Sequence, residues 1–244
     1  MKSIGELKLE FEELLKMEDS DDGVFEFKES LLESDERDRL EFHFSLLPEI
    51  DDEDLYRDVL YFFTCRRDKS GVADFLHEKY ENESDATLKS DILRTLGLLK
   101  APIARELSLR EITSPNRESR YNSIIVLGWT GKKKDLPVLN ERMQNDPDGQ
   151  LRSYSATAMR QIWYEHPKSR DAIAAYIRAA APQEKDAEAL TGMIITIQTL
   201  TRKKFGIKEG DYGDISGDVE QAKEKMIAFL NRKVSGIRCQ ESDQ

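Results

Sequence analysis

Apolar residues recur along one side of a predicted helix in several separate segments of the chain. In residues 87–99 they occupy Leu88, Ile92, Leu93 and Leu96. The spacing i, i+4, i+5 and i+8 places all four on one face of an α-helix. The pattern therefore predicts an amphipathic helix that buries this face.

The same pattern returns at regular intervals, which indicates an internal repeat. A shift of 31 residues aligns residues 87–99 with 118–130. A further shift of 32 aligns Arg120, Ile124 and Leu127 with Arg152, Ala156 and Met159, and residues 190–200 hold a less regular copy of the pattern. A shift of 33 in the other direction reaches Leu55, Val59, Leu60 and Phe63. The partner helices of these segments are expected around 71–80, 101–112, 135–143 and 169–181. One such pair cannot bury its own apolar face, so the pairs must stack.

An acid and a base flank the turns between these helices. Asp146 precedes Arg152 by six residues across Pro147, and Glu83 precedes Lys89 by six, whereas Ser114 stands before Arg120. We expect the acid to cap backbone amides and the arginine to pair with an acid of the neighbouring unit. Asp135, followed by Pro137, is expected to cap the helix at 135–143.

These residues resemble the HEAT repeats of α-solenoids. The matching positions are Asp146-Pro147, Leu151-Arg152, Ala156 and Met159, together with Ser119-Arg120, Ser123-Ile124 and Val126-Leu127-Gly128. Ser114 departs from the pattern, as does Arg160, which stands where two other units have glycine. The resemblance covers roughly residues 51–200. It implies an all-α fold, an α-solenoid of about five stacked helix–turn–helix repeats, and a role in protein binding.

The two ends of the chain differ from the repeats. Residues 1–50 are expected to form an acidic helical N-terminal cap, with helices over 3–18 and within 24–47. The repeats would then span 51–205. Residues 206–244 would hold a loop, a capping helix that begins at Asp218 and ends near Lys233, and a frayed tail.

Charge is unevenly distributed along the chain, whose net charge is −11. Residues 1–84 hold 26 acidic and 11 basic residues, against 22 and 26 in residues 85–244. Helix capping explains one or two of the consecutive acids Asp51, Asp52, Glu53 and Asp54, and the excess indicates a basic partner.

Sequence motifs for chemistry are missing. The chain has no phosphate-binding glycine loop, and its histidines, His43, His77 and His166, stand alone. We expect His43 and His77 to be exposed on helices. The loop 211–218 lacks the acid spacing of an EF-hand. We therefore expect no metal, no cofactor and no catalytic residue. No apolar run is long enough to span a membrane, and Cys65 and Cys239 lie far apart, which favours the cytoplasm.

In such solenoids the second helix of each repeat, here the one that bears Arg120 or Arg152, lines the concave face, so its exposed positions are candidate partner contacts. Excluding the apolar set leaves Asp58, Tyr61, Cys65, Asp91, Arg94, Asn122, Ile125, Trp129, Tyr154, Thr157 and Gln161. Tyrosine, tryptophan and arginine often anchor interfaces. In the alternative interpretation, Ile125, Trp129 and Tyr154 pack between adjacent helices.

These observations favour a non-enzymatic protein-binding solenoid that uses the acidic surface together with the concave residues. Small acidic solenoids of this size resemble bacterial immunity proteins, which neutralise a basic toxin domain. A HEAT-like lyase or chromophore-binding protein, with Cys65 as the reactive thiol, is the main alternative. A HEAT-like DNA glycosylase fits less well, because nucleic acid binding needs a strongly basic surface, and a general scaffold finds no specific support.

Overall fold

A computed structural model describes residues 1–16, 21–210 and 214–238 of the chain, with backbone only for Asp21 and 233–238. The frayed tail expected at 239–244 and part of the loop 211–218 lie outside the described residues. The chain divides into two compact units, Met1–Ala104 and Arg105–Gln244, with the boundary inside α7 (Pro102–Glu111).

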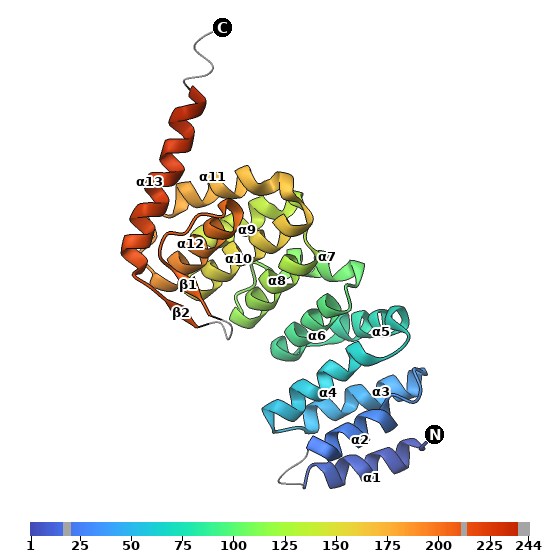
Figure 1. The fold of residues 1–244 in the computed structure, drawn as a ribbon. Helices are drawn as coiled ribbons and strands as arrows, with labels where there is room; N and C mark the ends of the chain where they lie inside the picture. Colours follow the sequence, from blue (N-terminus) through green and yellow to red (C-terminus); the bar gives the residue numbers. More distant parts are fainter. Residues whose placement is uncertain (17–20, 211–213, 239–244) are drawn as a thin grey trace. The chain divides into compact units, whose positions relative to one another are not determined.

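The first unit is built from helices alone, as far as the structure describes it (Figure 1). Its helices are α1 (Ile4–Leu14), α2 (Asp21–Leu31), α3 (Arg37–Leu46), α4 (Glu53–Cys65), α5 (Lys69–Asn82) and α6 (Ala86–Leu98), with a short 3-10 turn η1 (Leu47–Glu49) after α3. Contacts run from α1 to α2, α2 to α4, and α4 to α6, while α5 packs on α6. The predicted apolar residues Val59, Phe63, Ile92, Leu93 and Leu96 are fully buried in this unit.

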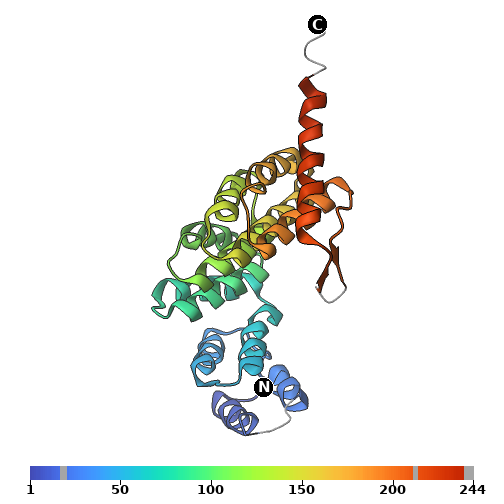
Figure 2. The ribbon, with the colours of Figure 1, turned by 90° about the vertical axis from the view of Figure 1, so that its left-hand side faces the viewer.

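The second unit contains two layers of helices (Figures 1 and 2). One layer holds α8 (Arg117–Thr130), α10 (Gly149–Glu165) and α12 (Ala187–Thr201), which contact one another in that order. The other holds α9 (Leu136–Asn145) and α11 (Arg170–Ala180), each preceded by a 3-10 turn, η2 (Lys133–Asp135) or η3 (Pro167–Ser169). The terminal helix α13 (Val219–Arg238) packs on α11 and α12. Ile124, Leu127, Ala156 and Met159 lie in its core, as the repeat pattern predicts.

Side-chain caps begin the second helix of each repeat. Asp52, Asp85, Asn116, Asp148 and Asp186 accept a backbone N–H from the first turn of α4, α6, α8, α10 and α12, respectively. Such a bond satisfies a donor that the helix itself leaves unpaired and stabilises a helix by about 1 kcal/mol. The repeat is therefore marked by its capping residues as well as by its apolar pattern.

The position two residues before the cap performs a second recurring task. Glu83, Asp146 and Glu184 each accept the amide N–H of the capping residue through a carboxylate oxygen, at 2.8–3.1 Å. Ser114 does the same with its hydroxyl at 3.2 Å. The expected amide-capping role is confirmed, and Ser114 is tolerated because a hydroxyl oxygen also accepts.

Two arginines link successive repeats of the second unit. Arg120 Nε donates to Asp146 Oδ2 at 2.9 Å, and Arg152 Nε donates to Glu184 Oε2 at 2.8 Å. Each guanidinium also donates to the backbone carbonyl six residues upstream, that of Ser114 or Asp146, at 3.1 and 2.8 Å. The spacing of six thus reflects a bond to backbone, and the predicted pairing with the next repeat's acid is confirmed.

Four expectations need correction. Asp135 occupies the cap position of α9 but makes no cap bond there, because its carboxylate pairs with Arg105 and accepts the N–H of Lys132. The loop after α12 contains a two-stranded antiparallel hairpin, β1 (Lys208–Glu209) and β2 (Ile215–Ser216). The helix expected to end near Lys233 continues to Arg238. Finally, His43 is fully buried.

Burial of His43 has a clear structural cause. Its ring stacks on Phe63 with centroids 3.7 Å apart, its Nε2 lies 2.8 Å from the carbonyl oxygen of Val59, and Arg66 Nε donates to its Nδ1 at 3.3 Å. Arg66, also buried, donates to Asp35 and to the carbonyl of Ser34 as well. Burial, and then the nearby Arg66, holds the pKa of His43 well below its ordinary value, so the ring is neutral.

Candidate functional site: an acidic surface of the first unit

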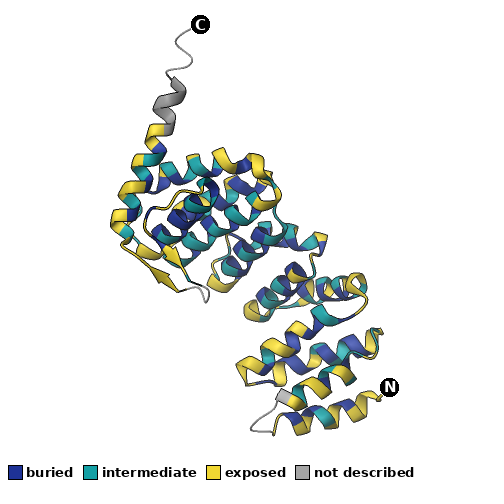
Figure 3. Ribbon diagram, viewed as in Figure 1, coloured by how far each residue is buried: buried dark blue, intermediate teal, exposed yellow. Residues whose placement is uncertain are grey.

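Negative charge is concentrated in the first unit. Residues 1–104 hold 28 acidic and 14 basic residues, a net charge of −14, against +3 for residues 105–244. Exposed positions cover much of the helices of the first unit, as Figure 3 shows. A surface with this charge attracts basic partners over distances of about 8 Å at physiological salt.

The consecutive acids Asp51, Asp52, Glu53 and Asp54, here named the α4 acid cluster, lie at the beginning of α4. All four are exposed. Asp52 is the N-cap and accepts the N–H of Leu55 at 2.8 Å. Arg57 lies one turn on and pairs with Asp54 at 2.7 Å and Glu53 at 3.8 Å. The helix thus uses one acid as a cap and balances part of the remaining charge with one arginine.

Two of the predicted contact residues, Asp58 and Tyr61, lie together on α4. They line one groove of about 290 Å³ with Val24, Phe25 and Lys28 of α2 and with Phe62, a set here named the α2–α4 groove. Both are exposed, Tyr61 to 53%. Three residues apart on a helix, they share a face. Asp58 makes no hydrogen bond or ion pair with another described residue.

Phe25 is a feature of this groove that the sequence analysis missed. Its side chain is 62% exposed, whereas that of Phe27 is fully buried. Residues two apart point to nearly opposite sides of a helix. Phe27 and Leu31 are four residues apart, a spacing that places both on one helix face, and both are buried. Phe25 lies off that face, but its place in a groove depends on α4, which the local sequence does not show.

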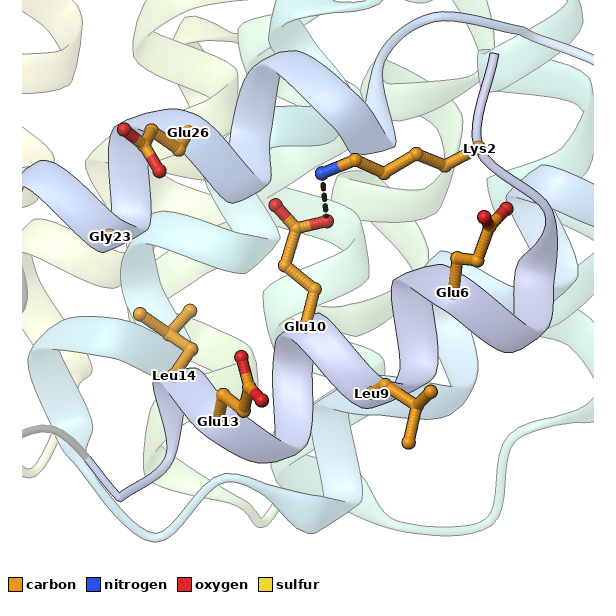
Figure 4. A pocket seen from close by; sticks show the side chains of 8 residues that line it. All are labelled: Lys2, Glu6, Leu9, Glu10, Glu13, Leu14, Gly23 and Glu26. Carbon is orange, nitrogen blue, oxygen red and sulfur yellow. Dashed lines mark hydrogen bonds and ion pairs between the residues drawn. The ribbon is translucent and has the colours of Figure 1, made fainter.

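A second groove, of about 450 Å³, lies between α1 and α2 and is here named the α1–α2 groove (Figure 4). Glu6, Glu10, Glu13 and Glu26 surround it, with Leu9 62% exposed at its edge. The ammonium of Lys2 donates to Glu10 Oε2 at 2.8 Å, and this bond raises the pKa of Lys2. Glu6 belongs to the capping box of α1, where the N–H of Ser3 lowers its pKa. Glu13 and Glu26 have no ion pair among the described residues.

The other predicted residues of the first unit are less accessible. Asp91 and Arg94 are half-buried on α6, and Tyr56 donates its hydroxyl to Asp91 Oδ2 at 2.9 Å. Burial, reinforced by Asp91, raises the pKa of Tyr56. Cys65, the last residue of α4, is also half-buried. These positions support the packing of α4 and α6 more than they offer a contact surface.

The predicted contact residues of the second unit are half-buried or buried. Asn122 is only 3% exposed, so its expected exposure is wrong: the flanks of α8 are covered by packing. Trp129 is half-buried, and Tyr154 packs edge-on against Tyr121 with centroids 5.3 Å apart. Gln161 is half-buried and lies over Gly128, where a Cβ would approach its Oε1 to 1.9 Å.

Arg160 departs from the repeat pattern without disturbing the stack. Its half-buried guanidinium lies 3.7 Å from Glu209 of the hairpin. Arg160 therefore contacts the hairpin, whereas the glycine at the equivalent position of two earlier repeats has no side chain that could make such a contact.

Other features bear on chemistry and on membranes. Within the described ranges, no three His, Cys, Asp or Glu side chains are grouped so that they could hold a metal ion. His77 is half-buried with Glu81 beside it at 3.4 Å, and His166 ends α10. None of the helices described combines the length and apolar composition needed to cross a bilayer.

Comparison with known proteins identifies the repeat. Residues 73–160 match the family model of HEAT repeats. No curated protein and no solved structure matches the chain. The matched region holds the capping residues Asp85, Asn116 and Asp148, the buried apolar face of their helices and the Arg120–Asp146 link. The chain therefore has an all-α helical-repeat fold of the α-solenoid type, and its residues 73–160 match HEAT repeats.

Proposed function

We propose that this chain is a non-enzymatic binding protein whose acidic first unit holds a basic protein in the cytoplasm. HEAT repeats commonly mediate contacts between proteins, which supports the binding role. The finer proposal is that of an immunity protein, which occupies and neutralises a cationic toxin domain. No feature of Cys65 favours the lyase alternative, because it is a half-buried cysteine at a helix end.

One observation carries the choice of surface. The α4 acid cluster and Asp58 are exposed on a unit with a net charge of −14, and Arg57 is the one cation paired with them among the described residues. Uncompensated surface charge of one sign weakens a compact fold slightly, through self-repulsion, but accelerates association with an oppositely charged partner. A basic partner would relieve that repulsion.

The experiment is co-purification of the tagged full-length chain from its native host at low and high salt, with the bound protein identified by mass spectrometry. The test variant carries Asp51→Asn, Asp52→Asn, Glu53→Gln and Asp54→Asn. It preserves the cap, because asparagine caps a helix as well as aspartate. A matched control neutralises four exposed acids of the second unit, Glu165, Asp171, Glu220 and Glu224.

We expect a stoichiometric basic protein that is lost at high salt and with the test variant but kept by the control. Expression of that partner alone should arrest growth, and co-expression of the chain should restore it. If the test variant and the control lose the partner equally, binding depends on the total charge of the chain, and the α4 acid cluster is not the binding surface. Recovery of nucleic acid or a pigment without a protein partner would reject the proposal.

A further inference from the structure

The α2–α4 groove presents two exposed aromatic rings beside a carboxylate. Phe25 on α2 and Tyr61 on α4 are 62% and 53% exposed, and both line the same groove as Asp58. Contiguous exposed apolar patches mark many interaction sites, and tyrosine is among the residue types that anchor protein interfaces. The groove thus offers two aromatic rings for apolar contact and the carboxylate of Asp58 for pairing with a cation.

A cation already lies against an aromatic ring in this groove. Lys28 Nζ is 5.5 Å from the centroid of the Phe62 ring, which is within the range of a cation–π contact. Lys28 reaches that ring from α2 while Phe62 belongs to α4. The ring of Phe62 is therefore already covered by a cation of this chain, and Asp58, which has no ion pair among the described residues, is the carboxylate left for a partner's guanidinium.

Acids flank the groove on both helices. Asp54, which pairs with Arg57, precedes Asp58 by one helical turn, and Glu29 follows Phe25 by one turn; both acids are exposed. The surroundings consequently favour a basic occupant and repel an acidic one. Among cationic side chains, arginine fits this combination best, because its flat guanidinium can stack on a ring and pair with a carboxylate through two N–H groups. A lysine ammonium is a point charge without a flat face.

We infer that the α2–α4 groove is the site at which an arginine of a basic partner segment docks, its guanidinium stacked on Tyr61 or Phe25 and paired with Asp58. This inference rests on the proposed function and specifies the chemistry of its partner. The partner's neighbouring apolar side chains would cover the rest of the two aromatic rings.

The test uses the full-length chain and a fluorescein-labelled peptide of about 18 residues, composed of arginine, leucine and alanine in an amphipathic helical pattern. A second peptide replaces every arginine by lysine and keeps the net charge. Fluorescence anisotropy at about 150 mM salt gives the two dissociation constants. We expect the arginine peptide to bind about 10-fold more tightly, from stacking and bidentate pairing together.

Three variants locate the effect. Tyr61→Ala, Phe25→Ala and Asp58→Asn should each reduce the preference for arginine, and the Tyr61→Ala/Phe25→Ala double variant should abolish it. Tyr164→Ala is the matched control, since Tyr164 is 61% exposed in the second unit. Circular dichroism confirms that each variant retains its helix content.

The outcomes separate this inference from the proposed function. Equal binding of the two peptides, binding of neither, or an arginine preference that survives the double variant overturns the inference. The co-purification experiment decides the proposed function independently, because a partner lost on neutralising the α4 acid cluster would remain a valid finding. Loss of the preference in Tyr164→Ala as well would also overturn the assignment to this groove.

Discussion

Arg120 of α8 and Asp146 before α10 form a buried ion pair between successive repeats, with Nε and Oδ2 2.9 Å apart and side-chain exposures of 9% and 0%. The carboxylate also lies 3.7 Å from Arg142, and the guanidinium donates to the carbonyls of Ser114 and Pro115. Every charge in the pair is therefore satisfied by several partners. Such networks are costly to break on one side, because the remaining charge stays buried.

Arg120→Met should therefore lower the free energy of unfolding of the second unit by about 3 kcal/mol. Arg170→Met is the control, since its partner Asp171 is 87% exposed and exposed pairs contribute little. Urea denaturation followed by tryptophan fluorescence is the measurement. Trp129 and Trp163, the two tryptophans of the chain, both belong to the second unit, so the signal reports that unit. Equal losses of unfolding free energy for the two substitutions would show that the buried Arg120–Asp146 pair contributes no more stability than an exposed pair.

Two glycines of the second unit should differ in their tolerance of alanine. At Gly192 of α12, a Cβ would lie 2.8 Å from the backbone oxygen and 2.9 Å from the Cα of Ser153, which cannot move without shifting α10. We expect Gly192→Ala to destabilise the unit by about 2 kcal/mol, despite the better helix propensity of alanine.

Gly128→Ala should cost less. The atom that a Cβ would meet first is the amide oxygen of Gln161, the end of a flexible side chain. The double variant Gly128→Ala/Gln161→Ala should recover most of the lost stability, because it removes the side chain that clashes. No side-chain truncation can relieve Gly192→Ala, because the clash there includes backbone atoms of Ser153. Thermal unfolding monitored by tryptophan fluorescence compares the three. Equal melting temperatures for Gly192→Ala and the wild type would refute the close approach of α12 to α10.

His43 should make the first unit less stable in mild acid. Because its pKa is lowered on folding, the unfolded chain binds the proton more readily. The stabilisation is complete above the ordinary value of 6.5 and is lost as the pH falls through the window below it, by up to about 1.4 kcal/mol per pH unit. Urea unfolding followed by circular dichroism at about pH 7 and about pH 5.5 measures the loss.

The control for this prediction is His77→Gln, which alters a half-buried histidine and should keep the pH dependence of the wild type. His43→Phe should be less stable at neutral pH but show a flatter pH profile. The carboxylates Glu41 and Glu78, whose pKa values Lys79 and Arg37 lower through hydrogen bonds, lose their contribution at more acid pH. An unchanged profile in His43→Phe would assign the dependence to other groups.

Local sequence patterns predicted the repeat and its links well. The apolar positions, such as Leu93 and Ile124, are buried as expected, and the pairing of Arg152 with an acid of the next repeat is confirmed. Both depend on short-range periodicity and on a fixed register between neighbours. Such features can be read along the chain, because each repeat contacts mainly the ones beside it.

Local sequence patterns could not predict burial that is caused by residues distant in the sequence. His43 is buried because Arg66 and Phe63, about twenty residues away, enclose its ring. Asn122 was placed on an exposed surface by register, but tight packing around α8 covers it. Phe25 became a candidate contact only once α2 was seen beside α4. The partner-binding roles of these surfaces remain predictions.

The arginine link has a consequence for how such an array can change length. Residues 115–146 contain both Arg120 and the Asp146 that it binds, so this segment carries the two halves of one junction. A tandem duplication of that segment would supply each new arginine with its carboxylate and each new helix with its Asn116 cap. Duplication of the whole segment would then require no compensating substitution at the new junction. Duplication of only half of it would leave an arginine without its carboxylate, or a carboxylate without its arginine.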